Sequence, residues 1–364
     1  PEDVLTYTGG IIGEIHNNNQ STSLIENTNR LVYLSNFGTV DANLFHGISR
    51  TNPIVLVLVH QFAGGIFGSV KGYGFKLNNG SEVHNGSFEN NGLIKGQYVN
   101  TLTYLYAAGI GVANTSEELA QISYMSNQNG FDITNLNYQN HNRYIYYAST
   151  VVDNSEKGIL LSRAYNTQDY TFGTSYFQSI SGLTNPDTIR IAPFFSVVND
   201  EPSTTKNKYP SKLLYVENKG DLSVGNISGS GPTIPINREI RISNITQATK
   251  VDYENVINSG DIKVLKINNT EDSGIYVAGI SWILPYTWSK PGDNPEYKMY
   301  TMTNVVNDGN IYTAGINGNT TISSYNDSTN SFSGSFSTIN NLYVAGLVNI
   351  NVGEIINAFN YGNI

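Results

Sequence analysis

Few side chains in this sequence have the types and spacing that catalysis or metal binding requires. The histidines lie far apart and include no pair at the His-x-x-x-His spacing of a zinc site; they are His16, His46, His60, His84 and His141. Residues 331–335 lack the Gly-x-Ser-x-Gly elbow of serine hydrolases. Cysteine is absent, which excludes disulfides, thiolate metal sites and a cysteine nucleophile. We therefore expect no catalytic residue, no metal and no cofactor.

Carboxylates offer an alternative. Many repeat proteins act on polysaccharides with paired carboxylates, and neighbouring repeats would have to bring together Asp252, Glu254, Asp261 and Glu271. Residues 271–274 and 307–310 carry oxygens of the kind that Ca²⁺ prefers, but neither stretch supplies the roughly six ligands of a calcium site. A polysaccharide-active enzyme is thus the alternative function.

Aromatic side chains are the more suggestive group, because the chain holds 25 tyrosines. Amphipathic rings give contact area at low entropic cost and stack on sugars. The densest places are Tyr144, Tyr146 and Tyr147 in one stretch and Tyr286 with Trp288 in another. These five residues are the candidate contacts to a protein or a glycan.

The charge balance excludes one class of partner and gives no support to another. The net charge is −9 and no Lys/Arg cluster occurs, so we expect no nucleic-acid partner. The longest apolar run, 54–59, is far shorter than the roughly 20 residues of a membrane-spanning helix and is typical of a buried strand. A membrane-inserting toxin segment at 53–70 is a further alternative. Residues 1–4 have neither the basic start nor the apolar segment of a signal peptide, so we expect none in this sequence.

The elements that must position these side chains repeat along the chain. The phrase Asn-x-Gly, followed two residues later by Ile, Leu or Val, predicts a corner and then an inward-facing strand position. Asn and Gly suit corners because both tolerate positive φ. The corner residues are Asn36, Gly38, Asn90, Gly92, Asn218, Gly220, Asn258, Gly260, Asn307, Gly309, Asn351, Gly353, Asn360 and Gly362. Looser corners stand at 129–133 and at 164–170, where the second has lost its glycine.

Opening phrases precede these corners, as in Tyr7–Gly13 and Phe62–Gly68. About eight units of roughly 45 residues would fill residues 1–364 as one array, with a loop or weak boundary near 225–236. Two rungs per unit would give about sixteen rungs and a rod on the order of 75 Å.

The stretch 115–119 resembles a capping box and predicts a short helix. Because the sequence stops within a phrase, we expect it to be part of a longer polypeptide.

The clearest copies resemble the GLUG-type repeat, whose pattern is Gly-Leu-Val-Gly followed by Asn-x-Gly-x-Ile and Asn-x-Tyr-x-x-Gly-x-Val. The residues that carry the resemblance are Gly346-Leu347-Val348, Asn351-Val352-Gly353-Glu354-Ile355, Asn357, Phe359 and Gly362-Asn363-Ile364, and the openings at 10–13 and 65–68. The family implies an all-β, right-handed parallel β-solenoid. Position 349 is Asn where the pattern has Gly, and Pro193 interrupts the fifth opening.

GLUG-type repeats occur in large exported bacterial proteins, including adhesins, two-partner secreted exoproteins and toxins, and share no catalytic residues. The resemblance therefore implies a non-enzymatic repeat region of a secreted or surface-exposed virulence factor that contacts a host-surface protein or glycan. An alternative fold is the β-propeller, because 311–316 followed by 324–330 also resembles a Kelch-type blade and eight such units would close a ring.

Overall fold

A computed structural model gives the structure of the chain. It describes residues 4–17, 34–41, 59–72, 76–77, 88–95, 103–115, 120–127, 131–132, 144–155, 158–172, 188–197, 211–225, 234–236, 239–246, 248, 250–265, 267–269, 274–285, 287–289, 297–314, 321–326, 331–335 and 342–364. Every regular element within these ranges is a β-strand. The fold class is therefore all-β, as the sequence predicts.

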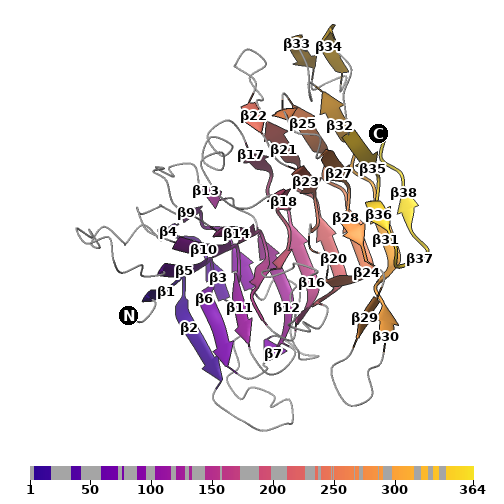
Figure 1. Ribbon diagram of the computed structural model, residues 1–364. Helices are drawn as coiled ribbons and strands as arrows, with labels where there is room; N and C mark the ends of the chain where they lie inside the picture. The colour runs from indigo at the N-terminus through magenta and orange to yellow at the C-terminus, as the bar shows by residue number, and fades with distance from the viewer. Residues whose placement is uncertain are drawn as a thin grey trace, which may run out of the picture.

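One long parallel sheet collects the strands that end at the repeated asparagines, and we call it the spine sheet (Figure 1). Its strands, in order, are β3 (Leu34–Asn36), β8 (Phe88–Asn90), β12 (Ala120–Asn127), β16 (Ile159–Asn166), β20 (Ser211–Asn218), β24 (Val251–Asn258), β31 (Thr301–Asn307) and β37 (Glu354–Ile356), with β38 (Phe359–Asn360) also on β31 and β7 (Lys76–Leu77) on β12. Spatial order follows chain order, so each unit lies beside the next.

The opening phrases form a second set of parallel strands, which we call the opening strands. They are β1 (Val4–Gly9), β5 (Val59–Gly64), β10 (Thr103–Ala108) and β14 (Tyr144–Ala148) in one sheet, and β18 (Thr188–Ile191), β23 (Glu239–Ser243), β27 (Ile275–Ala278) and β35 (Leu342–Ala345) in another. Both sheets again follow chain order.

Two further sets complete each unit. After the opening strands come β2 (Ile12–Asn17), β6 (Phe67–Gly72), β11 (Gly111–Thr115), β15 (Val151–Asp153) and β19 (Ser196–Val197), then β28 (Ser281–Leu284) with β36 (Val348–Asn351). After the asparagine corners come β4 (Val40–Asp41), β9 (Ile94–Lys95) and β13 (Phe131–Asp132), then β17 (Tyr170–Phe172), β21 (Leu222–Gly225), β25 (Ile262–Leu265) and β32 (Ile311–Ala314).

The remaining strands form three pairs. The parallel pair is β22 (Ile234–Ile236) with β26 (Ile267–Asn269), and the antiparallel pairs are β29 (Thr287–Ser289) with β30 (Tyr297–Met299) and β33 (Thr321–Asn326) with β34 (Ser331–Ser335). All other pairings among the described strands are parallel, and these strands form neither a propeller nor a closed barrel. Strands β20 and β24 pair across the proposed weak boundary at 225–236.

Aliphatic side chains from successive units stack into two buried clusters between the sheets. The aliphatic residue two places after each corner glycine belongs to this core. The five examples buried in the second cluster are Val40, Ile94, Leu222, Ile262 and Ile311. In β16 and β20 inward and outward residues alternate except at the fifth residue. That residue has a left-handed backbone, with φ of 52° at Arg163 and 54° at Tyr215, which bends the strand.

Two expectations about the repeat need correction. Each unit occupies one position in the spine sheet, with β7 and β8 sharing one position and β37 and β38 another, so the sheet has eight positions and not about sixteen. Seven steps of about 4.8 Å make the stack roughly 34 Å long rather than 75 Å. The third corner is also shifted, because Asn127 and not Asn129 pairs with Asn90 and Asn166. The stretch that predicts a helix starts at Thr115, the last residue of β11, and 116–119 lie outside the described residues.

Candidate binding surface

The repeated asparagines form a ladder of side-chain amides along the spine sheet, and those named below are buried except for Asn360. Asn218 Nδ2 donates to Asn258 Oδ1 at 3.0 Å, and Asn258 Nδ2 donates to Asn307 Oδ1 at 2.8 Å. Equivalent bonds join Asn36 to Asn90, Asn166 to Asn218 and Asn307 to Asn360. Each amide also donates to the carbonyl two residues later, as Asn218 does to Gly220 O at 3.0 Å. The asparagines are thus structural groups with saturated hydrogen bonds.

The corner glycines were expected to adopt positive φ, but the structure shows that they are needed for another reason. Among the glycines that the structure describes, positive φ occurs at Gly158, Gly225 and Gly274, and none of these is a corner glycine. Instead, a β-carbon on Gly260 would collide with the carbonyl oxygen of the preceding corner. Close stacking of units, rather than positive φ, therefore requires glycine there.

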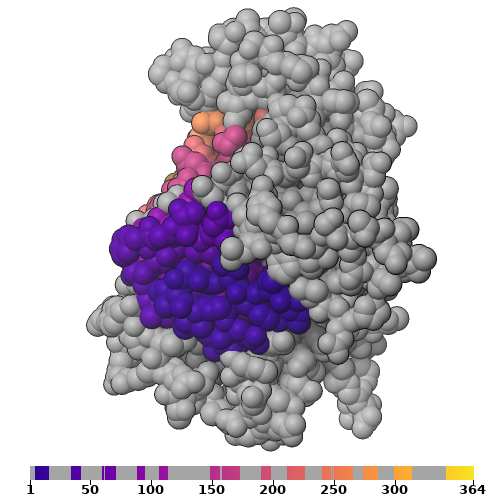
Figure 2. Space-filling view, turned by 90° about the vertical axis from the view of Figure 1, so that its left-hand side faces the viewer, coloured from indigo at the N-terminus to yellow at the C-terminus, as the bar shows by residue number. Residues whose placement is uncertain are grey.

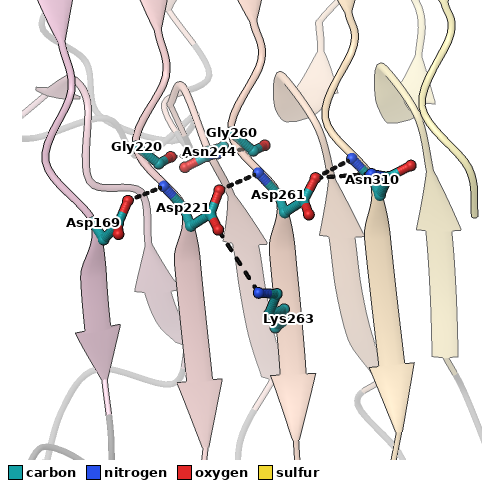
Figure 3. Close-up of polar contacts among 8 residues, drawn as sticks. All are labelled: Asp169, Gly220, Asp221, Asn244, Gly260, Asp261, Lys263 and Asn310. Atoms are coloured by element: carbon teal, nitrogen blue, oxygen red, sulfur yellow. Dashed lines mark hydrogen bonds and ion pairs between the residues drawn. The ribbon is translucent and has the colours of Figure 1, made fainter. Parts of the chain in front are cut away.

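A row of carboxylates and amides follows the corners on the next residue of each unit (Figure 3). Asp169 Oδ1 accepts from the backbone N–H of Asp221 at 2.9 Å, and Asp221 Oδ1 accepts from the N–H of Asp261 at 2.8 Å. Asp261 Oδ1 accepts in turn from the N–H and the amide of Asn310, at 2.7 and 3.0 Å. Each side chain therefore satisfies a backbone donor of the following unit.

Burial raises the pKa of the Asp221 carboxyl above its ordinary value of 3.8. The negative charges of Asp261 and Asp169 also raise this pKa, while the hydrogen bond from Asp261 N–H and the charge of Lys263 lower it. Lys263 Nζ lies 3.7 Å from Asp221 Oδ2 (Figure 3). The row therefore satisfies backbone donors from one unit to the next, and burial makes the charged form of Asp221 less favourable.

The carboxylates considered for glycan hydrolysis do not share one site in the described structure. Asp252 Oδ1 accepts from the backbone N–H of Thr301 at 2.8 Å, Glu254 pairs with Lys212, and Asp261 belongs to the corner row. Glu271 lies outside the described residues. Within the ranges that the structure describes, no three His, Asp or Glu side chains are grouped as metal ligands.

The opening strands carry a column of residues in register, which we call the outer column. Pairing joins Arg190 to Arg241, Arg241 to Tyr276 and Tyr276 to Tyr343. On β23 and β27 the neighbouring residues in the sequence, such as Ile242 and Val277, are buried in the core. Because side chains alternate along a strand, the column faces away from that core.

Ring contacts organise this part of the outer column. The rings of Tyr276 and Tyr343 stack with centroids 4.7 Å apart and planes 9° apart. Trp282, from β28, meets Tyr276 edge-on at 6.2 Å, and the guanidinium carbon of Arg241 lies 3.5 Å from the centroid of the Trp282 ring. Trp282 is buried, whereas Tyr343 is 48% exposed. One cation and two stacked phenols are therefore held together at the surface.

Earlier units continue the same column with aromatic residues. Register joins Tyr7 to Phe62, Phe62 to Tyr106 and Tyr106 to Tyr146. The rings of Tyr7 and Phe62 stack at 5.1 Å and those of Phe62 and Tyr106 at 4.6 Å. Phe62 and Tyr106 are buried in a separate apolar cluster, so this half of the column serves packing. Figure 2 shows the end of the stack where the first unit, in indigo, forms the surface.

The five contact residues proposed from the sequence are placed as follows. Tyr144, Tyr146 and Tyr147 lie in β14, where they pair with Tyr104, Tyr106 and Ala107 of β10. Trp288 lies in β29 opposite Lys298, and Tyr286 is outside the described residues. Only Tyr146 falls in register with the outer column. Arg190, Arg241, Tyr276, Trp282 and Tyr343 are the candidates that the sequence did not single out as a group.

Of the predicted corners, those at 36, 90, 218, 258, 307 and 360 lie on the amide ladder, together with Asn166, whose third residue is Gln168. The corner at Asn351 and Gly353 differs, because Asn351 ends β36 and pairs with Leu284. There, Gly353 N donates to Asn351 Oδ1 at 3.1 Å.

The segment considered for membrane insertion begins outside the described residues and continues into β5 and β6, which pair with β1, β2, β10 and β11. Where the structure describes the chain, it contains no helix with the length and apolar character needed to cross a bilayer. Comparison with family models, with curated proteins and with solved structures finds no match to this chain.

Proposed function

We propose that the chain is a right-handed parallel β-solenoid, with one coil per unit, that forms a non-enzymatic repeat region of a secreted or surface-exposed bacterial virulence factor. Its role is contact with a host-surface glycan or protein, as in an adhesin or exotoxin. Parallel pairing in chain order supports the solenoid, because crossovers between parallel strands are right-handed in nearly all proteins. The GLUG-type phrases support the cellular setting.

The observation that carries the binding role is the stack of Tyr276 and Tyr343 beside the Arg241–Trp282 pair. Tyrosine, tryptophan and arginine dominate binding energy at protein interfaces because they combine a large apolar area with hydrogen-bonding groups. An outward stack of such residues contributes little to the core. A binding partner would explain why this stack of aromatic side chains lies at the surface.

The other polar groups support a scaffold rather than an enzyme. The asparagine ladder and the acidic corner row are engaged by amides and backbone donors of neighbouring units. Catalytic carboxylates need instead to face a substrate with matched acid and base roles.

The test measures binding of the labelled chain to host epithelial cells by flow cytometry. The double variant Tyr276→Ala/Tyr343→Ala is compared with Tyr215→Asn, which removes an exposed tyrosine from the spine sheet. We expect saturable binding by the wild type and by Tyr215→Asn, and a loss of roughly tenfold or more in the double variant. Circular dichroism checks that all three are folded. Absence of saturable binding, or equal binding by the double variant, overturns the proposal.

A further inference from the structure

We propose that the outward face of the spine sheet, centred on Tyr215, is a contact surface between two copies of this chain. The face consists of the outward side chains of β16, β20, β24 and β31, which are consecutive strands in the middle of the sheet (Figure 1). The proposal goes beyond the contact with a host surface, because it concerns a different sheet and a different occupant.

Two residues on this face keep a backbone conformation that does not suit them. Each strand from β16 onward bends at a residue with a left-handed backbone, and we call these residues the bend ridge; they are Arg163, Tyr215, Asn255, Asn304 and Asn357. Asparagine tolerates this conformation, whereas it is strained for arginine and tyrosine. Strained residues gather at functional sites, so Arg163 and Tyr215 indicate a function on the ridge.

Apolar side chains surround Tyr215 on the outward face. The side chains of Tyr215 and Ile257 are 51% and 39% exposed, and those of Tyr165, Leu214 and Val306 are half-buried. Each of these strands has a neighbour on both sides in the sheet, so the exposure does not depend on either end of the stack. Parallel sheets usually have both faces covered, so an outward face with these residues predicts a partner.

The charges on this face favour a second copy as that partner. Lys212 pairs with Glu254 at 2.5 Å, and Glu217 pairs with Lys219 at 3.2 Å, so these four charges cancel within the chain. The chain as a whole has a net charge of −9, which makes two copies repel each other. A face whose charges are already paired is where two copies approach with the least repulsion.

The spacing of the outward side chains also favours a second copy. These side chains recur about every 4.8 Å from strand to strand. A second copy has the same spacing, so the side chains of one ridge fit between those of the other at every unit. A helix, with about 5.4 Å per turn, loses this match after a few steps. A contact between two copies also uses the same patch twice, which suits a single apolar patch.

The area of the face suits a weak dimer. The stack is roughly 34 Å long and a strand of eight residues spans about 26 Å, so each copy offers on the order of 900 Å². A standard interface buries about 800 Å² on each partner. Leu214 and Tyr215 are consecutive outward residues, which makes the face convex at the bend. The contact therefore uses part of the face, and the dimer forms and separates reversibly.

Sedimentation equilibrium tests the proposal. Over a roughly hundredfold range of protein concentration we expect the wild type to pass from monomer to dimer. Tyr215→Asn and Ile257→Ser should each weaken the dimer roughly tenfold or more, because they remove central apolar contacts. Met299→Ser is the matched control, since Met299 is 41% exposed, lies in β30 outside the face and should not affect the dimer. Circular dichroism checks that every variant is folded.

Disulfide cross-linking locates the contact. The chain contains no cysteine, so Asn255→Cys places a single thiol near the middle of the ridge. A disulfide requires two Cα atoms within about 7 Å, so it reports direct contact between the two copies. With diamide as the oxidant that takes up the two thiol hydrogens, Asn255→Cys should give a covalent dimer. Met299→Cys should remain a monomer.

The outcomes are separate from those of the proposed function. A wild type that stays monomeric overturns the proposal, and so does a dimer that Tyr215→Asn and Ile257→Ser leave intact. Equal cross-linking of Asn255→Cys and Met299→Cys also overturns it, because random collisions would then explain both. Cell binding is measured at concentrations where the wild type is a monomer, so retained cell binding by a Tyr215→Asn variant that no longer dimerises upholds both proposals.

Discussion

The carbonyl oxygen of Gly220 occupies the space that a β-carbon on Gly260 would need. The two residues are the same corner position in consecutive units, and Figure 3 shows them side by side. The equivalent collision recurs between Gly92 and Gly38 and between Gly309 and Gly260. At these three corners the added β-carbon would collide with a backbone atom, so no flexible side chain could move away to make room.

Gly260→Ala should accordingly lower the free energy of unfolding by roughly 3 kcal/mol or more, since a buried backbone must shift. Gly38→Ala is the matched control, because the nearest atom to its added β-carbon would be Asn36 Oδ1 at an ordinary 3.6 Å. It should change stability by less than about 0.5 kcal/mol. Urea unfolding of both variants gives the comparison, and similar costs would show that glycine is needed for another reason.

The amide ladder predicts a large effect of removing one buried asparagine. Asn218 donates to Gly220 O and Asn258 Oδ1 and accepts from Asn166 Nδ2. Asn218→Ala removes all three bonds and leaves buried partners unpaired, which should cost roughly 3 kcal/mol in urea unfolding.

The exposed ladder at the bend supplies the control for Asn218. There, Asn304 Nδ2 donates to Asn255 Oδ1 at 3.2 Å, and this bond is exposed. Asn304→Gly keeps a residue that tolerates its φ of 53° and should cost less than about 1 kcal/mol. A cost for Asn218→Ala no larger than this would contradict the structural role of the buried ladder.

The left-handed residues of the bend predict opposite effects of two substitutions at one position. Tyr215 has a φ of 54°, where the equivalent residues in later units are Asn255, Asn304 and Asn357. Tyr215→Val should destabilise by roughly 1–2 kcal/mol, because a β-branched residue is strained there. Tyr215→Asn loses the ring beneath Arg163, 5.8 Å away, but gains a tolerated backbone, so its thermal unfolding should be nearly unchanged. Equal destabilisation by both would refute the argument.

Asp221 predicts a specific dependence of stability on pH. Its folded pKa is raised, so the folded chain keeps this proton at pH values where the unfolded chain has lost it. The contribution of the residue is most favourable below the unfolded pKa and is lost as pH rises through the folded pKa. Asp221→Asn keeps an Oδ1 acceptor for Asp261 N–H, as Asn310 does for Asn363, and removes the charge.

Thermal melts of Asp221→Asn from acid to neutral pH should therefore lack this decline, and the variant should be at least as stable as the wild type at pH 7. Asp221→Ala also removes the charge but loses the acceptor, and should be less stable than Asp221→Asn by about 1 kcal/mol. A larger decline with pH in Asp221→Asn than in the wild type would show that the favourable pairing with Lys263 dominates instead.

Much of the fold is predictable from the sequence because the corner is a local signal. Asparagine, glycine and an aliphatic residue at fixed spacing identify six of the ladder positions, and each aliphatic residue before the last corner is buried as expected. The corner predicted at Asn129-Gly130 is wrong, because Asn-Gly is a stronger local turn signal than Asn127, which holds the register position. There the pairing of Phe131 with Ile94, a contact between distant residues, decides the register.

The outer column is harder to predict from the sequence than the corners are, and the reason is physical. Its members stand at one position of each opening phrase, but the loops between phrases differ in length, so the alignment depends on long-range pairing. Tyr276 and Tyr343 each stand three residues before the glycine of an opening phrase. Arg190 and Arg241 stand at the same distance before Pro193 and Asn244, which replace that glycine. An alignment of the units on the third residue before that glycine position places these two arginines and two tyrosines in one column.

The asparagine ladder also gives the molecule a direction. In the five cross-unit bonds that the structure describes, the earlier residue donates and the later one accepts. At one extremity Asn36 therefore offers an oxygen, and at the other Asn360 offers an N–H. Two such arrays could be fused in tandem with their hydrogen-bond polarity continuous, whereas joining like extremities would set donor against donor or acceptor against acceptor.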